Sequence, residues 1–120
     1  MVVDLLERPD ADRLFHALSD GTRRDIVART MREPLSVSSL ARLYPMSCAA
    51  VQKHVTVLHG AGLVTKERQG REQLVRGDAD ALRRAAALLD RLAELWTDRI
   101  DRLGDALAAE LDRLDEGSPR

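Results

Sequence analysis

Apolar side chains recur every three or four positions through the first half of the chain, with polar clusters between the runs. This spacing puts one apolar stripe on each of several short helices. The pattern predicts four helices, over residues 10–18, 22–31, 36–44 and 48–60. A hydroxyl or carboxylate stands at the start of each of the last three, where it can accept a hydrogen bond from a backbone N–H of the first turn. These residues are Asp20 or Thr22, then Ser36, then Ser47.

Prolines and glycines mark the ends of these helices. Pro34 and Pro45 end the second and third, because a proline disfavours the helical conformation of the residue before it. Gly60 and Gly62 supply the stop signal of the fourth helix. Leu35 is expected to begin a very short strand. The arginines of the second helix are expected to face water: Arg23, Arg24 and Arg29.

The third and fourth helices predict a helix-turn-helix unit. A tight turn around Pro45 joins them, and in such a unit the second helix enters the major groove of DNA. Ala50, Val51, Val55 and Leu58 give the second helix a narrow apolar stripe for packing. Polar residues lie around its other faces: Ser47, Gln52, Lys53, Thr56 and His59.

A β-hairpin is predicted directly after this helix. Two runs that can alternate between inward and outward positions span residues 64–76, and Gln69-Gly70-Arg71 forms the turn between them. Such a wing could lay Lys66, Arg68 or Arg71 along phosphates or into the neighbouring minor groove.

The last third of the chain carries a long apolar stripe in steps of three and four. The stripe extends over more than 30 residues, which is more than the small domain before it can cover, so we expect a second copy of the chain to bury it. The stripe contains Leu82, Ala86, Leu89, Ala93, Trp96, Ile100, Leu103, Leu107, Leu111 and Leu114. Gly104 interrupts it, and a kink or break is expected there because glycine costs about 1 kcal/mol relative to alanine inside a helix.

These elements predict a mainly α fold with a small β-hairpin, a winged helix-turn-helix of order α-α-α-α-β-β-α. We expect a single domain over residues 1–120, with a DNA-binding core at about 10–77 and a C-terminal dimerisation helix at about 79–115. The residues expected at the dimer interface are Leu14, Leu82, Leu89, Trp96, Ile100 and Leu103.

The distribution of charge is more informative than its total of −1. Residues 42–77 hold six basic side chains against two acidic ones, whereas residues 78–120 hold seven against eleven. A basic middle beside an acidic tail is the asymmetry expected when one segment meets phosphate and another must not. Double-stranded DNA is therefore the partner that the charge pattern favours.

Several other classes find no support. Asp4, Glu7 and Arg8 interrupt the apolar start, and no apolar run approaches the roughly 20 residues of a membrane span, so we expect a cytoplasmic protein with no membrane partner. One cysteine excludes an intrachain disulfide or cysteine-pair metal site. No phosphate-binding loop or pair of catalytic carboxylates is recognisable, so we expect neither an enzyme nor a cofactor.

Four segments together resemble the ArsR family of bacterial winged-helix repressors. They are ALSDGTRRDIV (17–27), PLSVSSLA (34–41), MSCAAVQKHVTVLHGAGLVTKERQGREQLV (46–75) and ELWTDRIDRL (94–103). The resemblance implies a homodimer whose first and last helices pair, whose recognition helices occupy successive major grooves, and whose repression an effector usually relieves. The small-molecule effector is left unassigned.

The resemblance also implies which residues contact DNA. Carried over by position, these are Ser47, Gln52, Lys53 and His54, with Thr56 as a further candidate and Arg71 on the wing. Where the family often has serine, this chain has Gln52, which could contact adenine through two hydrogen bonds.

The metal sites of the family have no counterpart in the sequence. Metal-sensing members carry a cysteine pair on the helix that here spans 36–43, or histidines and carboxylates on the last helix. This chain has no cysteine in that range and no histidine after His59. The resemblance is therefore to the non-metal-sensing subgroup, and no metal site is expected.

Cys48 has two interpretations. A thiol at a helix N-terminus could sense redox state, because the helix dipole favours the thiolate there. The favoured interpretation is a small residue tolerated in the first turn, because one thiol without a nearby histidine or cysteine makes a poor metal site.

The prediction from the sequence is a homodimeric repressor that binds an inverted repeat through the Ser47–Gly60 helix and the 64–76 wing. The alternative is a winged-helix dimer that serves as a protein-interaction module without binding DNA.

Overall fold

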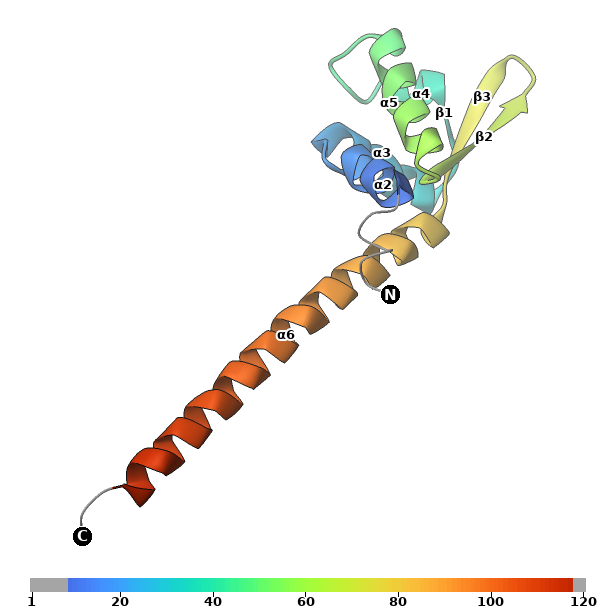
Figure 1. Cartoon of the computed structure of the whole chain (residues 1–120). Coiled ribbons are helices and arrows are strands. Elements are labelled where there is room, and N and C mark those ends of the chain that lie inside the picture. Colours follow the sequence, from blue (N-terminus) through green and yellow to red (C-terminus); the bar gives the residue numbers. More distant parts are fainter. Residues whose placement is uncertain (1–8, 118–120) are drawn as a thin grey trace. The chain divides into compact units, whose positions relative to one another are not determined.

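The computed structural model describes residues 9–117 (Figure 1). Its elements follow in the order α2 (Pro9–Leu18), α3 (Gly21–Arg32), β1 (Leu35–Ser36), α4 (Val37–Ala41), α5 (Cys48–Gly60), β2 (Val64–Gln69), β3 (Glu72–Gly77) and α6 (Ala79–Glu116). The chain is mainly helical with a small antiparallel sheet, as predicted. The apolar start that Asp4, Glu7 and Arg8 interrupt lies outside the described range.

The chain divides into two compact units, one ending at Ala86 and the other beginning at Ala87. The first contains everything from α2 to the first two turns of α6, and the second consists of the rest of α6. The division therefore falls inside a helix. Among the described residues, no helix is both long enough and apolar enough to cross a membrane.

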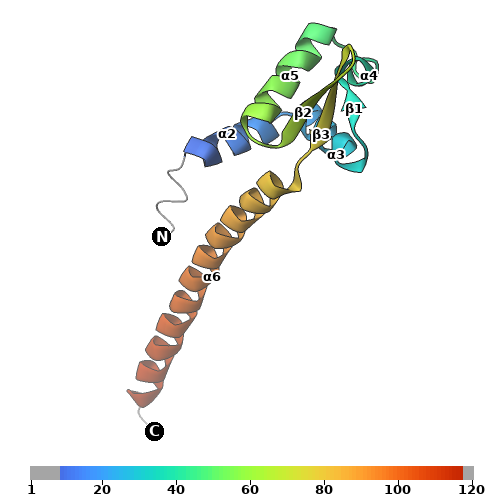
Figure 2. The same cartoon turned by 90° about the vertical axis from the view of Figure 1, so that its right-hand side faces the viewer.

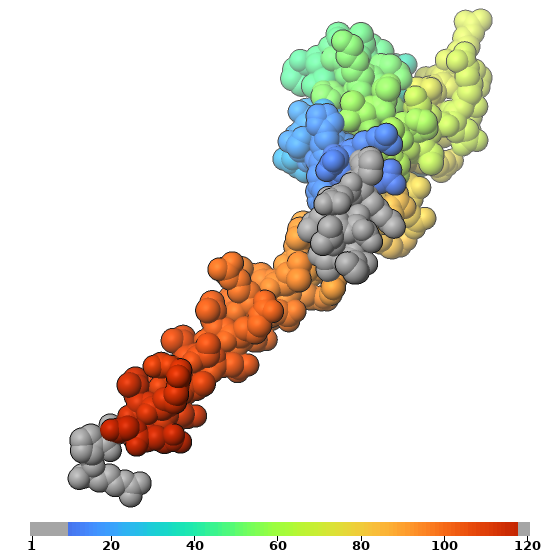
Figure 3. Space-filling view, in the orientation of Figure 1, coloured from blue at the N-terminus to red at the C-terminus, as the bar shows by residue number. Residues whose placement is uncertain are grey.

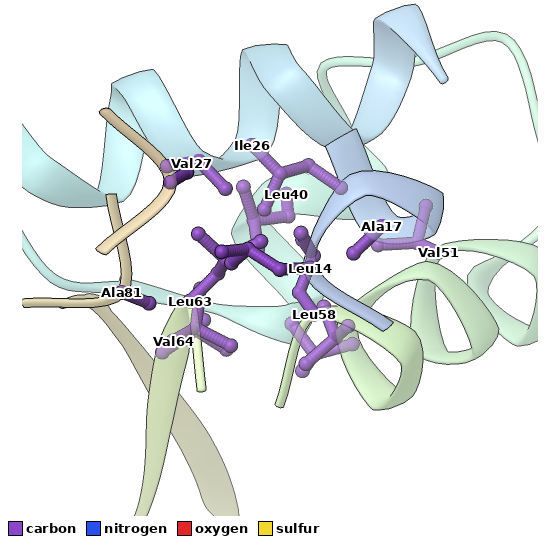
Figure 4. Packing of buried hydrophobic residues seen from close by; sticks show 14 residues of the cluster. Leu14, Ala17, Ile26, Val27, Leu40, Val51, Leu58, Leu63, Val64 and Ala81 are labelled. Carbon is purple, nitrogen blue, oxygen red and sulfur yellow. The ribbon is translucent and has the colours of Figure 1, made fainter. Parts of the chain in front are cut away.

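The core of the first unit consists of aliphatic side chains from all the helices and from strands β2 and β3 (Figure 4). None of the aromatic residues in the described range is a member of this buried cluster. Ile26 of α3, Leu40 of α4, and Val51, Val55 and Leu58 of α5 are completely inaccessible to solvent. Leu14, predicted at the dimer interface, is a core residue of its own chain and only 5% exposed. Little of its surface therefore remains for a partner, and its place at the dimer interface stays a prediction.

Three helices begin at the predicted caps. The side chains of Asp20, Ser36 and Ser47 accept hydrogen bonds from the third backbone N–H beyond each of them, at 3.1, 3.0 and 3.1 Å respectively. In each case the cap has extended backbone geometry, which turns its side chain back over the first turn.

The helix predicted over 36–44 is shorter than expected, because α4 ends at Ala41. The N–H of Leu43 bonds to the carbonyl of Leu40 at 3.0 Å and closes the turn, which leaves the Leu43 side chain 47% exposed. Tyr44 turns away from α4 and donates from its hydroxyl to Asp25 Oδ2 of α3 at 2.5 Å. A tertiary hydrogen bond therefore takes the place of the last helical turn.

The end of α5 is fixed by Gly62 rather than by both predicted glycines. Gly62 has φ of +76°, whereas Gly60 lies within the helix. The N–H of Leu63 bonds to the carbonyl of Leu58, and that of Gly62 to the carbonyl of His59, each at 3.0 Å. This pair of bonds is the Schellman motif, which satisfies the last carbonyls of the helix and turns the chain into β2.

The predicted hairpin is present, and β1 extends it to a three-stranded sheet of order β1-β3-β2 (Figure 2). Gln69 pairs with Glu72, so only Gly70 and Arg71 form the loop. Gly70 has φ of +60°, the geometry that the first position of a type II′ turn requires. Leu35 and Ser36 pair with Val75 and Leu74, so the very short strand expected at Leu35 is present, although the predicted element order counted only the two strands of the hairpin.

The end of β3 lies against the end of α3. A Cβ added to Gly77 would be 2.8 Å from Cγ and Sδ of Met31 and 2.9 Å from its backbone nitrogen. Only glycine permits this close approach. The N–H of Asp78 then bonds to the carbonyl of Leu63 at 2.8 Å, which fixes the chain where α6 begins.

The register of α6 differs by one residue from the predicted stripe at its start. Ala81, Ala85 and Leu88 are the buried positions, whereas Leu82 is half-buried and Ala86 and Leu89 are exposed. The helix also continues through Gly104, where a kink or break was expected. In the second unit the large apolar side chains from Leu89 to Leu114 are exposed, among them Trp96 at 62%.

Candidate nucleic-acid interface

Helix α5 has one face in the core and another open to solvent. Val51, Val55 and Leu58 fill the buried face, so the opposite side of the helix carries Lys53 and Thr56, both exposed. The Thr56 hydroxyl donates to the carbonyl of Gln52 at 2.9 Å. Lys53 makes no hydrogen bond or ion pair within the described part of the chain. A free ammonium on the outward face is placed to contact a phosphate.

Gln52 lies at the side of α5 that faces the hairpin. Its amide nitrogen donates to Oε1 of Gln73 on β3 at 3.2 Å, and both residues are half-buried. The predicted base-contacting helix and the predicted wing are thus joined by a side-chain hydrogen bond. The hairpin stands beside α5 and projects from the body of the first unit (Figure 3).

His54 faces the other side of α5, towards α3. Its Nδ1 is 3.3 Å from Nη1 of Arg23, and an arginine can only donate. Nδ1 is therefore the acceptor in this contact. Of the predicted DNA-contacting residues on α5, Gln52 and His54 are half-buried, whereas Lys53 and Thr56 are exposed.

Arg23 was predicted to face water, but it is half-buried. Its Nε and Nη2 donate to the carbonyls of Ala17 and His16 at 2.8 and 2.9 Å. The guanidinium thus closes the C-terminal end of α2 and reaches α5 at the same time. Arg24 and Arg29 are exposed as predicted, and each also makes a hydrogen bond at the surface, Arg24 to the carbonyl of Leu18 at 2.8 Å and Arg29 to Asp25 at 2.7 Å.

The wing places its basic residues by strand alternation. Lys66 pairs with the buried Val75 and Arg68 with Gln73, so these side chains share the face of the hairpin that is turned towards the core and α5. Arg71 is exposed in the loop at the tip. Arg76 lies on the other face, 3.8 Å from Glu67. The three predicted basic contacts therefore follow the α5 side and the tip of the wing.

Asp25 links α3 to the turn before α5. The hydroxyl of Tyr44 and the guanidinium of Arg29 donate hydrogen bonds to this carboxylate, in that order of effect, and hold its pKa below the ordinary value. Burial, with the same hydrogen bond to Asp25, raises the pKa of Tyr44 to about 12. This contact, which the sequence did not reveal, fixes the turn that orients the start of α5.

Cys48 is exposed at the first position of α5. Within residues 9–117, no three histidine, cysteine, aspartate or glutamate side chains gather in a group that could hold a metal ion. Of the residues predicted at the dimer interface, Leu82 packs in part against the core of its own chain, whereas Leu89, Trp96, Ile100 and Leu103 are all about half exposed or more.

A short helix, a turn and a capped second helix, followed by a hairpin with basic residues on the adjoining face, define a winged helix-turn-helix protein. A family model described as a helix-turn-helix domain matches residues 18–67. The HTH-type transcriptional regulator Rv2034 of Mycobacterium tuberculosis is 43% identical over 86 residues, which cover 72% of this chain and 78% of that protein.

Solved structures give the same result. An ArsR-like transcriptional regulator from Rhodococcus sp. RHA1 superposes with a TM-score of 0.78 at 33% identity, covering 83% of this chain and 92% of that one. The homodimeric winged helix-turn-helix DNA-binding domain of Mb0332 from Mycobacterium bovis has a TM-score of 0.58 at 26% identity, covering 71% and 79%.

The chain belongs to the ArsR family of winged helix-turn-helix transcriptional regulators. It is a DNA-binding regulator and not an enzyme, which confirms these two predictions and favours DNA binding over the alternative of a protein-interaction module.

Proposed function

We propose that the protein is a homodimeric repressor that binds an inverted-repeat operator in the cytoplasm. In each protomer α5 enters the major groove, and the β2–β3 wing contacts phosphates or the neighbouring minor groove. The observation that carries the proposal is the placement of Lys53 on the open face of α5 beside a wing whose Lys66 and Arg68 face the same helix. Arg71 at the tip of the wing supplies a further phosphate contact.

Two observations support the homodimer. The second unit exposes a row of large apolar side chains that includes Trp96, Ile100 and Leu103, and water is a poor environment for a row of this length. The Mb0332 domain of the same fold is homodimeric. A second copy of the same helix would cover the row, and a two-fold axis would pair two α5 helices with the two halves of a symmetric site.

The salt dependence of operator binding tests the role of Lys53. Lys53→Ala is expected to weaken binding to all sequences and to lower the slope of log affinity against log salt by about 1, because one phosphate contact is lost. Fluorescence anisotropy over a salt series measures the slope. The control is Arg102→Ala, which removes a charge from the second unit. An unchanged slope in Lys53→Ala with intact binding would show that this ammonium contacts no phosphate.

The spacing of the operator tests the symmetric arrangement. Protomers related by a two-fold axis contact half-sites about one helical turn apart, so inserting half a turn of DNA, about 5 base pairs, moves one half-site to the opposite face of the duplex. Binding is expected to be lost with the half-turn insertion. Equal affinity for the altered operator would contradict symmetric binding by a dimer. Absence of salt-sensitive binding to any DNA would overturn the proposed function altogether.

A reporter gene placed behind the operator tests the direction of regulation. Expression of the protein is expected to lower the output, and addition of Zn²⁺ or other divalent metals is expected to leave that output unchanged. A rise in output on expression would make the protein an activator. Relief of repression by a metal would contradict its place in the non-metal-sensing subgroup.

A further inference from the structure

We propose that Gln73 of the wing is a specificity-determining residue, which holds the amide of Gln52 in the orientation that contacts adenine in the operator. This inference rests on the proposed function and deepens it, because it names a base and the pair of residues that selects it. It begins from the hydrogen bond between Gln52 Nε2 and Gln73 Oε1, 3.2 Å long, which joins α5 to β3.

The chemistry of the amide decides which hydrogen-bonding groups of Gln52 remain free to bind a base. A glutamine side chain has two N–H donors and one carbonyl oxygen. Gln73 takes one donor of Gln52, so the other N–H and Oε1 remain for a ligand. Adenine presents an amino donor and the N7 acceptor side by side in the major groove, and an amide with one donor and one acceptor matches that pair. Guanine presents two acceptors there, and the amide oxygen cannot bind either of them.

The placement of both residues on packed elements supports this role. Gln52 follows the fully buried Val51 on α5, and Gln73 shares a sheet face with the fully buried Val75. Both backbones are therefore fixed by the core. Gln73 also lies opposite Arg68 on β2, so the basic side chain next to it can contact the phosphate backbone while Gln52 contacts the base.

Holding the amide in advance increases discrimination between bases. A free glutamine has several rotamers and can present either the oxygen or the nitrogen to a base, so part of its binding energy is lost in ordering it. Immobilising a side chain of this kind changes an equilibrium by roughly 2- to 12-fold. The hydrogen bond to Gln73 fixes which side of the Gln52 amide carries the nitrogen and which carries the oxygen before DNA binds. It is a positioning residue and needs no contact with the base itself.

Selection of bound sequences from random DNA by the wild-type protein and by Gln52→Ala identifies the operator position whose base preference depends on Gln52. Adenine is expected there. The ratio of affinity for adenine to affinity for guanine at that position is then measured for three further variants. Gln73→Met keeps the length of the side chain and removes the acceptor, Gln73→Glu keeps an acceptor, and Gln69→Met changes a wing glutamine that makes no hydrogen bond to α5 in the described chain.

Gln73→Met is expected to lower the ratio roughly 2- to 12-fold. Gln73→Glu should keep it, although its charge weakens binding to both sequences alike, and Gln69→Met should leave it unchanged. A purely structural role for Gln73 would lower both affinities together and leave the ratio as it was. Thermal unfolding of each variant checks that the wing still folds.

The outcomes separate this inference from the function on which it rests. A wild-type protein that binds no DNA overturns the proposed function. DNA binding with no adenine preference that depends on Gln52, or with the ratio intact in Gln73→Met, overturns only the role of Gln73.

Discussion

Single residues join the helices of the first unit through contacts that sequence periodicity does not report. Arg23 bonds to two carbonyls at the end of α2 and to His54 of α5, and Tyr44 bonds to Asp25. The partners of Arg23 are backbone oxygens and a residue 31 positions away. An arginine on a helix is ordinarily expected in solvent, so such contacts come to light only once the fold is known.

Replacement of Arg23 tests its role as a clamp. Arg23→Ala leaves the carbonyls of His16 and Ala17 without these donors and is expected to lower the free energy of unfolding by about 1–3 kcal/mol. Arg32→Ala, a neighbouring arginine with no such bond in the described structure, should change it far less. Urea unfolding followed by circular dichroism measures both. Equal values for the two variants would rule out the clamp.

The contact between Tyr44 and Asp25 predicts the pH dependence of stability. The pKa of Asp25 is lowered, so its contribution is present above the unfolded value near 3.8 and is lost as the pH falls below it. The pKa of Tyr44 is raised to about 12, so its contribution is present below its ordinary value of 10.0 and is lost as the pH rises from there towards 12.

Tyr44→Phe removes the alkaline part of this dependence and, by removing the bond to Asp25, weakens the acid part. The midpoint of urea unfolding should therefore fall less between pH 9 and pH 11 in the variant than in the wild type. The opposite ordering of the two proteins would show that another group controls the alkaline side.

Elements begin at positions that the sequence predicts well and end at positions that it predicts less well. Caps depend on one side chain and its own backbone, so Asp20, Ser36 and Ser47 could be identified from residue type and spacing. The end of α4 depends on Tyr44 reaching Asp25, which is a tertiary event. The register of the buried face at the start of α6 also depends on tertiary packing, because the small residues Ala81 and Ala85 are buried there in place of larger apolar ones.

In the candidate site, too, some residues could be predicted from the sequence and others depend on tertiary structure. Family resemblance supplied Lys53 and Gln52 as DNA-contacting residues, but it did not supply Gln73, whose only signal is its register opposite Arg68. Strand register follows from the two-residue loop at Gly70, so a hairpin with a known turn could have indicated which wing residues face α5.

Replacing either of the two glycines at the end of α5 by alanine is expected to change stability, in opposite directions. Gly62 has a positive φ, so Gly62→Ala is expected to destabilise the protein by about 1–2 kcal/mol. Gly60 lies inside the helix with no atom within 4 Å of an added Cβ, so Gly60→Ala should stabilise it by about 0.5–1 kcal/mol. Thermal unfolding of both variants compares them directly. Shifts of the same sign would contradict the assignment of the helix end.

At the scale of the whole molecule, association should depend on the second unit. Trp96→Asp places a charge in the exposed apolar row and is expected to convert the dimer into a monomer. Asp98→Ala, which changes one charge on the same helix outside that row, should remain dimeric. Sedimentation equilibrium measures the masses, and a stable Trp96→Asp dimer would place the interface elsewhere.

The core of the first unit has its last member at Ala85. A cell that carries several regulators of this kind needs each of them to pair with its own copies, and mixed pairs would combine half-sites that occur together in no operator. Because the apolar row from Leu89 onwards contributes nothing to that core cluster, duplicated genes can change the row without disturbing the DNA-contacting unit. If the row forms the proposed dimer interface, mutations can change which copies pair without changing the proposed DNA-contacting residues of α5.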